Sequence, residues 1–342
     1  GRAHDALHMA QSLIANPRHP KLNMLDGKTR SAKYGRQRLL EVLERFELWD
    51  EAVRLADTPY LEPTNLTDER VKRLRLLALA FFEKDEANQV RSCRNQLDEL
   101  LATAKQEHEK ARSDARDKAR KENRNAKDTE KTVKDAGKKT AAQITTIEKT
   151  RSEIDFHLAL LENNIAEAKK HIGDVRREKY DLAGLHLRLG DEEKALALSK
   201  EAVEKAMGQV LPLLARIEIL HALGRTDETR AAFDVLAPIS AHLDPLASPV
   251  GRVMEIAREL GLGAWQAGPV VRDDVGVRPE LDALGPVAWS PPVGHDFTLP
   301  DQHGTPVTSA AYRGRPMILI FYLGHGCLHC TEQLNAFAKK AA

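Results

Sequence analysis

Apolar residues recur at helical spacing through much of the first 262 residues, in pairs of segments separated by short turns. Residues 36–56 show this pattern first, with a break in the spacing that indicates a tight connection between two helices. A second pair spans residues 70–101, after a stretch of breakers in which Asn65 or Thr67 is expected to cap the helix start. The pattern predicts helical hairpins.

Two later segments repeat each other more clearly. Residues 182–203 and 214–236 each place a Leu-Gly pair just before an acidic turn and a second helical segment. The two glycines, Gly190 and Gly224, are 34 residues apart. This period resembles that of the tetratricopeptide helix–turn–helix repeat.

A small residue is expected where the two helices of such a hairpin approach closely. Ala195 occupies this position, Thr229 stands at the corresponding place in the next repeat, and Ala52 and Ala87 resemble degenerate versions of it. We therefore expect four or five hairpins. Stacked hairpins form either a curved surface for a protein partner or simply a packed α-domain, and the sequence leaves both interpretations open.

Residues 98–160 form an unusually charged segment, which we call the arm. Between residues 101 and 142 it holds 13 Lys/Arg against 8 Asp/Glu, with almost no large apolar side chain. Its later part has isoleucines and leucines at heptad spacing, with Arg151 filling one skipped position. We expect two long antiparallel helices joined near 135–137. Interleaved acids and missing aromatics favour a solvated helical arm over a nucleic-acid site.

Composition limits the classes of partner. The chain has 342 residues and a net charge of +1, so no overall field attracts nucleic acid or a membrane surface. No apolar run reaches the roughly 18–20 residues that span a bilayer, and we expect no membrane span in this segment. The sequence begins at Gly1, with no start methionine and no charged-then-apolar run in its first residues. Localisation is unknown, with an exported or periplasmic site favoured and any signal placed upstream.

Three cysteines are too few for a disulfide scaffold. Cys93 stands alone in a helical pattern and is predicted to be a small buried apolar residue, with a reactive thiol as the alternative. Cys327 and Cys330 form the one close pair.

The residue pattern changes from helical to strand-like near the end of the chain. Residues 297–299 alternate like a strand, a turn follows at 301–304, and residues 317–323 are continuously apolar. Such a run predicts a strand buried on both faces of a sheet. A helix is expected to begin at or near Cys327, with Cys330 in its first turn.

Two cysteines at the start of a helix suggest redox chemistry. The unpaired amide groups of the first turn favour thiolate over thiol. Cys327 is expected to attack and Cys330 to resolve the mixed disulfide. The order strand, turn, CxxC and helix is more specific than a bare CxxC.

The stretch "DFTLPDQHGTPVTSAAYRGRPMILIFYLGHGC" resembles the opening of the thioredoxin-like redoxin domains of the AhpC/TSA (peroxiredoxin-related) group. The resemblance covers residues 289–342 and aligns Cys330 with the peroxidatic cysteine of that family. Leu323 and Cys327 stand where its proline and threonine would be, which moves the motif toward dithiol exchange. In a peroxidase variant Cys330 would react with peroxide and Cys327 would resolve it. The family fold implies further strands and a cis-proline loop after Lys340, so a truncated domain is expected.

Metal binding is the main competing interpretation of this motif. His325 and His329 lie beside the two cysteines, but ligands this close in sequence seldom converge on one ion. His4 and His8, with His19, form a weaker candidate. We expect no metal and no cofactor. A purely structural CxxC is a further alternative. Other signature motifs of hydrolases, nucleotide-binding proteins and metalloproteases are absent from the sequence.

The predicted fold class is mostly α: tetratricopeptide-like helical hairpins with a long charged coiled-coil insertion, followed by the truncated start of a thioredoxin-like α/β domain. The predicted regions are 1–97 (loop and hairpins), 98–160 (arm), 161–262 (repeats), 263–288 (a Pro- and Gly-rich linker that includes Trp265) and 289–342 (redoxin domain, beginning with Trp289).

Two functions stay open. The first is a thiol–disulfide oxidoreductase or thiol-dependent antioxidant protein of the redoxin class, acting on a thiol/disulfide protein or a hydroperoxide. The second is a non-catalytic scaffold whose repeats bind a protein partner and whose redoxin portion is vestigial or regulatory.

Overall fold

The computed structural model describes residues 2–16, 24–25, 30–245, 247–268, 294–315, 317–324 and 326–341. The chain divides into two compact units, Gly1–Trp289 and Ser290–Ala342, and each is described by itself. Most of the described residues are helical, and strands occur only in the second unit, which confirms the predicted fold class.

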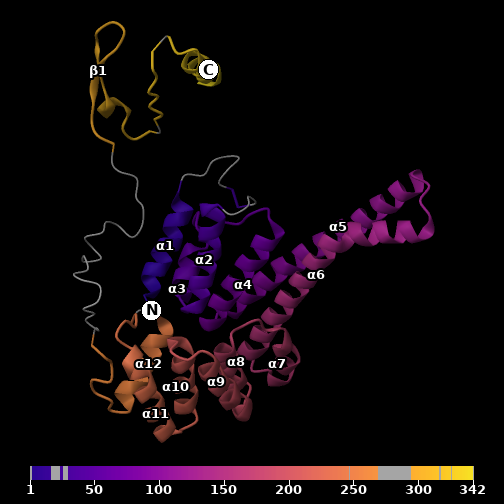
Figure 1. Cartoon of the computed structure of the whole chain (residues 1–342), viewed down its shortest axis with the longest axis vertical. Helices are drawn as coiled ribbons and strands as arrows, with labels where there is room; N and C mark the ends of the chain where they lie inside the picture. Colours follow the sequence, from indigo (N-terminus) through magenta and orange to yellow (C-terminus); the bar gives the residue numbers. More distant parts are fainter. Residues whose placement is uncertain are drawn as a thin grey trace. The chain divides into compact units, whose positions relative to one another are not determined.

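Helices build the described part of the first unit (Figure 1). In chain order they are α1 (Ala3–Ala15), α2 (Ser31–Arg45), α3 (Trp49–Leu55), α4 (Thr67–Glu83), α5 (Ala87–Lys121), α6 (Ala126–Leu161), α7 (Ile165–His171), α8 (Lys179–Arg188), α9 (Glu192–Lys205), α10 (Val210–Ala222), α11 (Thr226–Leu236) and α12 (Ser248–Glu259). Two short 3₁₀ turns, at Ile172–Asp174 and Ala237–Ile239, extend α7 and α11. None of the described helices is both long and apolar enough to cross a membrane.

One type of turn connects the two helices of each hairpin. The residue two positions before the second helix has a left-handed backbone, and the amide after it donates to the carbonyl five residues earlier. Leu48 N, for example, donates to Leu43 O at 2.9 Å. The left-handed residues, with φ between 51° and 73°, are Glu47, Asp85, Asn163, Gly190 and Gly224. The described residues therefore contain five hairpins closed in the same way.

The close approach of the paired helices also repeats. The fourth residue of the second helix is fully buried in every hairpin: Ala52, Val90, Ala168, Ala195 and Thr229 are each 0% exposed. The expectation that Ala87 fills this position is wrong. Ala87 is the first residue of α5 and only half-buried, and Val90 packs at the interface instead. Whether these hairpins are tetratricopeptide repeats in the strict sense stays a prediction.

The helix starts where it was expected, just after Asn65. Neither Asn65 nor Thr67 caps it, however. The residue preceding α4 is Leu66, and no side chain caps the helix. Thr64 Oγ1 instead accepts a hydrogen bond from Leu66 N at 3.2 Å. The polar side chain therefore stabilises the turn that leads into the helix.

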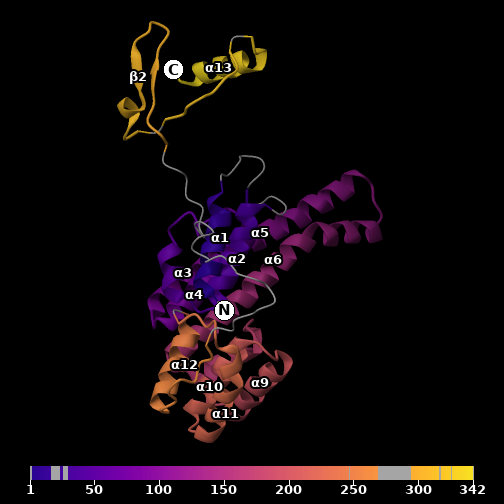
Figure 2. The ribbon, with the colours of Figure 1, turned by 60° about the vertical axis from the view of Figure 1, so that its left-hand side comes forward.

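Helices α5 and α6 contain the two long segments predicted for the arm, and Figure 2 shows them projecting side by side from the hairpins. The expected joint at 135–137 is wrong, because the chain turns at residues 122–125. Asn125 caps α6 there by accepting from Asp128 N at 2.9 Å. Gly137 lies inside α6, where a Cβ atom would stand 2.7 Å from His108 Cε1. The glycine marks a close helix contact rather than a turn.

The heptad spacing identified the correct face of α6. Ile147 and Ile154 are buried, and Ile144 and Leu158 pack against the same core. Arg151, at the skipped position, forms an ion pair with Asp98 of α5 at 3.3 Å. The base of the arm is thus continuous with the core of the second and third hairpins.

The second unit begins with a small hairpin. Strand β1 (Thr298–Pro300) pairs antiparallel with β2 (Pro306–Thr308), and Leu299 lies opposite Val307. The predicted turn is confirmed, since Gly304 N donates to Asp301 O at 3.0 Å and Gly304 has a φ of 81°. A 3₁₀ turn, Ser309–Tyr312, follows, and α13 (Leu328–Ala341) ends the described chain.

The strand predicted for residues 317–323 is not formed. Its side chains are exposed, and Ile318, Phe321 and Leu323 expose 77%, 87% and 91% of their surface. A strand is stable only when neighbouring strands pair with its backbone and other layers cover its faces. The described strands of this unit, β1 and β2, pair with each other. Residues 317–323 have the composition of a buried strand, but no strand among the described residues pairs with them.

The predicted linker falls mostly outside the described residues, and so does Trp289. Trp265 is described, and its ring packs edge-on against Phe233 with centroids 5.1 Å apart. It therefore belongs to the core of α10, α11 and α12 within the first unit.

Candidate redox site

Cys327 lies directly before the first residue of α13, and Cys330 lies in the first turn. The backbone amide of Cys330 donates to Cys327 Sγ at 3.4 Å. The carbonyl of Cys327 accepts from Thr331 N at 3.0 Å, as the residue before a helix should. Cys327 is thus the N-terminal cap of α13, with its sulfur facing the unpaired amides of the first turn.

A glycine turn places the cap. Gly324 ends the apolar run with a φ of 99°, a conformation that glycine adopts without steric cost. Its carbonyl accepts from Cys327 N at 3.1 Å, which closes the turn. The predicted helix start at or near Cys327 is confirmed. His325 lies outside the described residues.

The surroundings of the pair favour thiolate chemistry. A hydrogen bond from the side chain of Cys327, followed by one from the backbone of Leu323, lowers the pKa of the Cys330 thiol. Both thiols are free and half-buried, so a reagent or substrate can reach them. A thiolate at an accessible helix N-terminus can attack a disulfide or a peroxide.

The histidine beside the pair points into solvent. His329 is 96% exposed, and its nearest ion-pair partner is Glu332 at 3.7 Å. In the part of the chain that the structure describes, no three His, Cys, Asp or Glu side chains form a group that could hold a metal.

The N-terminal histidines, His4 and His8, are also not brought together. His4 Nδ1 lies 3.3 Å from Asp244 Oδ2 and ties α1 to the segment before α12. His8 is exposed, and His19 lies outside the described residues. His4 therefore has a structural contact, and nothing joins it to His8.

Cys93 is chemically different from the pair. Its side chain lies in the core between α4, α5 and α6, and burial raises the pKa of its thiol to about 11. It stays protonated at neutral pH, which confirms the prediction of a small buried apolar residue.

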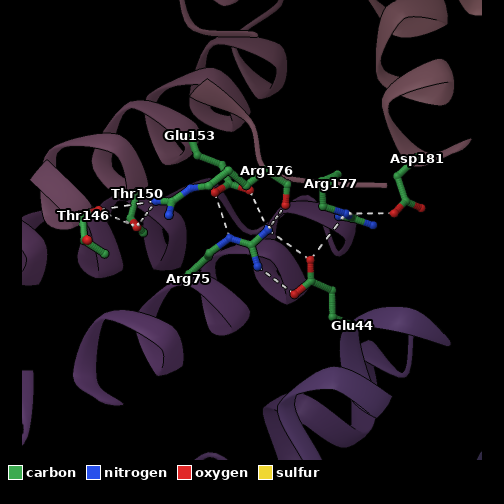
Figure 3. A network of polar contacts seen from close by, with 8 residues as sticks. All are labelled: Glu44, Arg75, Thr146, Thr150, Glu153, Arg176, Arg177 and Asp181. Atoms are coloured by element: carbon green, nitrogen blue, oxygen red, sulfur yellow. Dashed lines mark hydrogen bonds and ion pairs between the residues drawn. The ribbon is translucent and has the colours of Figure 1, made fainter. Parts of the chain in front are cut away.

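The first unit contains a network of ion pairs and hydrogen bonds that no sequence motif indicates (Figure 3). Arg75 of α4 donates to Glu44 of α2 at 2.7 Å and to Glu153 of α6 at 2.8 Å. A further bond from Arg75 reaches the carbonyl of Arg176 at 2.8 Å. Because these residues lie 31 to 101 positions from Arg75, no local motif could reveal the network.

The network continues through the neighbouring arginine. Arg177 Nε lies 3.6 Å from Glu44 and 3.3 Å from Asp181 of α8. Burial raises the pKa of Asp181 to about 6, although Arg177 lies beside it. The donors of Arg75 are directed at carboxylates and a carbonyl, so this cluster joins hairpins rather than presenting a free reactive group.

Comparison with known proteins identifies one region. The model of the AhpC/TSA family matches residues 293–342. The match supports a redoxin domain at the C-terminal end of the chain, and it includes both Cys327 and Cys330. Neither a curated protein nor a solved structure matches the chain.

Proposed function

We propose that this protein is a thiol–disulfide oxidoreductase of the redoxin class, with Cys327 and Cys330 as its reacting pair. The observation that carries the proposal is the hydrogen bond from Cys330 N to Cys327 Sγ at the start of α13. The AhpC/TSA match over the same residues supports it independently. The substrate class is a protein disulfide or dithiol.

The reaction follows from the order of the two sulfurs. The Cys327 thiolate attacks one sulfur of a substrate disulfide, forms a mixed disulfide and releases one substrate thiolate. The Cys330 thiolate then attacks Cys327 Sγ and releases the second substrate thiolate. The substrate gains two electrons, and the protein is left with a Cys327–Cys330 disulfide. A dithiol donor returns the two electrons through the reverse steps.

A peroxide substrate is the second candidate, favoured by the lowered pKa of Cys330. Here the Cys330 thiolate attacks a hydroperoxide oxygen, the O–O bond breaks, and the sulfenic acid of Cys330 and an alcohol or water result. Cys327 then condenses with the sulfenic acid, which releases water and forms the same disulfide.

Turnover assays separate these roles. In a Cys93→Ser background, the full chain should reduce insulin disulfides with dithiothreitol as donor. Cys327→Ser should abolish this activity, and Cys330→Ser should trap a mixed disulfide with the substrate. Peroxide treatment of Cys327→Ser, followed by dimedone labelling of Cys330, tests the second candidate. If neither assay responds to either substitution, the catalytic proposal is wrong and the scaffold interpretation gains support.

A further inference from the structure

A groove of about 860 Å³ runs along one side of the arm, between α5 and α6. We call it the arm groove, and it is lined by His108, Arg112, Arg116, Ala126, Thr129, Glu130, Val133, Lys134, Asp135, Gly137, Lys138 and Ala141. Both helices contribute to it, and the redox site does not.

The floor of the arm groove consists of small residues from α6. Val133 and Gly137 are buried against α5, whereas Ala126 and Ala141 are exposed. These four residues are 7, 4 and 4 positions apart, so they share one face of the helix. Small side chains on such a face allow the backbone of another helix to approach closely.

The walls of the arm groove are cationic. Arg116 on α5 and Lys134 and Lys138 on α6 are exposed and make no ion pair within the described part of the chain. Arg112 pairs with Glu109 of its own helix at 3.2 Å. The long aliphatic stems of these side chains can cover apolar surface while their charged ends reach a partner.

The positive charge of the arm is concentrated at its far end. Residues 116–134 contain 8 Lys/Arg against 4 Asp/Glu, whereas residues 101–115 contain 3 of each. Half of the residues that line the groove, among them Arg116 and Lys134, lie in this part of the arm, where a negatively charged partner is attracted most strongly.

We propose that the arm groove docks an acidic amphipathic helix of a partner protein. An apolar stripe of small residues on that helix would lie along the small-residue face of α6, with Ala126 and Ala141 as its exposed contacts, and carboxylates on both sides of the stripe would meet Arg116 and Lys138. The added helix would complete a three-helix bundle over a stretch where α5 and α6 cover each other with little apolar surface.

Charge and composition separate this partner from the other candidates. A second copy of the arm carries the same excess of positive charge and would be repelled. Glu130 and Asp135 line the groove, and they would oppose a continuous phosphate backbone. No Phe, Tyr or Trp side chain lines the groove for base stacking, and the ring of His108 is held by a hydrogen bond with Thr140 Oγ1 at 2.8 Å. Carboxylates spaced along a helix can avoid these two acids and still reach the cations.

The test uses a fluorescent, blocked peptide of about three heptads, with an alanine and leucine stripe flanked on both sides by glutamates. Anisotropy titration with the full chain should show binding that weakens about tenfold between 50 and 300 mM salt. A peptide with glutamine for glutamate should bind about tenfold more weakly than the original. A scrambled peptide of identical composition should also bind weakly, because its stripe is lost.

Matched variants place the site on the arm. The triple variant Arg116→Glu, Lys134→Glu, Lys138→Glu should weaken binding of the acidic peptide by about tenfold or more. The control Lys110→Glu, Lys121→Glu, Lys139→Glu makes the same change in net charge at residues that do not line the groove, and it should change binding by less than about threefold. Ala141→Trp, which leaves the charge unchanged, should weaken binding by filling the groove.

Several outcomes would overturn the proposal. One is an equal loss in both triple variants, and another is undiminished binding by Ala141→Trp or by the scrambled peptide. A third is no binding of the acidic peptide together with binding of a DNA duplex or of phosphatidylserine vesicles. Circular dichroism of each variant should match the unsubstituted protein, since every altered side chain is exposed.

Discussion

Two apolar runs of similar composition have opposite fates in this protein. The run "LRLLALAFF" at residues 74–82 lies in α4, and most of its leucines and Phe82 are buried between neighbouring hairpins. The run "MILIFYL" at residues 317–323 is extended and exposed. A helix satisfies its own backbone hydrogen bonds and then needs only packing against its neighbours. A strand needs other strands before it can be buried at all.

The largest predicted effect tests this difference directly. Phe82→Ala should lower the free energy of unfolding of the helical unit by about 3–5 kcal/mol, because it removes a fully buried aromatic ring. Phe321→Ala should change the stability of the full chain by less than about 0.5 kcal/mol, because that ring is exposed in the second unit. Urea denaturation followed by circular dichroism measures both. Similar effects of the two substitutions would contradict the comparison.

The charge network should have the next largest effect. Arg75→Met should destabilise the protein by about 3 kcal/mol, because Glu153, buried beside it, loses its principal partner. Adding Glu153→Leu should recover part of the loss, since the second substitution removes the stranded carboxylate. Urea denaturation tests this pair of variants. A double variant that is less stable than Arg75→Met alone would contradict the account.

The next prediction concerns the reactivity of the thiols, which should be lower for Cys93 in the first unit than for Cys330 in the second. Burial raises the pKa of Cys93 to about 11, whereas that of Cys330 is lowered below its ordinary value. At pH 7.5 a larger fraction of Cys330 than of Cys93 should therefore be thiolate, and Cys330 should be alkylated faster. Mass spectrometry after timed iodoacetamide treatment of the native chain resolves the sites. Faster labelling of Cys93 would contradict both assignments.

Replacement of His157 should have the smallest effect on stability, and the size of this effect should depend on pH. Its ring is buried between Phe82 and Phe156, and neither nitrogen has a hydrogen-bond partner. Burial, followed by the charges of Arg177 and other arginines, holds the pKa of His157 well below its usual range. The folded state therefore binds fewer protons than the unfolded state once the pH falls below about 6.5.

This linkage fixes the sign of the effect. The folded state loses stability as the pH decreases from about 6.5, because the unfolded imidazole takes up a proton first. His157→Phe removes that loss and should stabilise the protein by about 1–2 kcal/mol near pH 5.5, and by less at pH 8. Denaturation curves at the two pH values test it. A gain that is larger at pH 8 would contradict the assignment.

Local features were predictable from the sequence. The periodicity of Leu39, Leu43 and Ala52 identified a helical hairpin, and Gly190 and Gly224 marked two of its turns. The turn at Asp85 was expected from the hairpin pattern of residues 70–101, whereas the turn at Asn163 was missed because no glycine marks it, although its φ is positive. Aspartate and asparagine tolerate this conformation, so the same turn shape recurs along the chain without a fixed residue type.

Features that depend on distant partners were not predictable. The sequence predicts a turn near Gly137, but the glycine is needed there because His108 of the opposite helix lies close to it. Nothing near Arg75 in sequence indicates Glu44 or Glu153. At the candidate site, the sequence predicted the start of α13 at Cys327, because the apolar run, glycine and helix pattern are adjacent. The hydrogen bond between the two cysteines required the folded turn.

The most direct test of the central claim is the thiol–disulfide equilibrium of Cys327 and Cys330. The full chain with Cys93→Ser would be equilibrated in glutathione buffers of graded potential, quenched with acid and analysed by mass spectrometry. The account predicts a single two-electron transition to an intramolecular Cys327–Cys330 disulfide. Both cysteines remaining reduced, or carrying only separate glutathione adducts, across the whole series would contradict it.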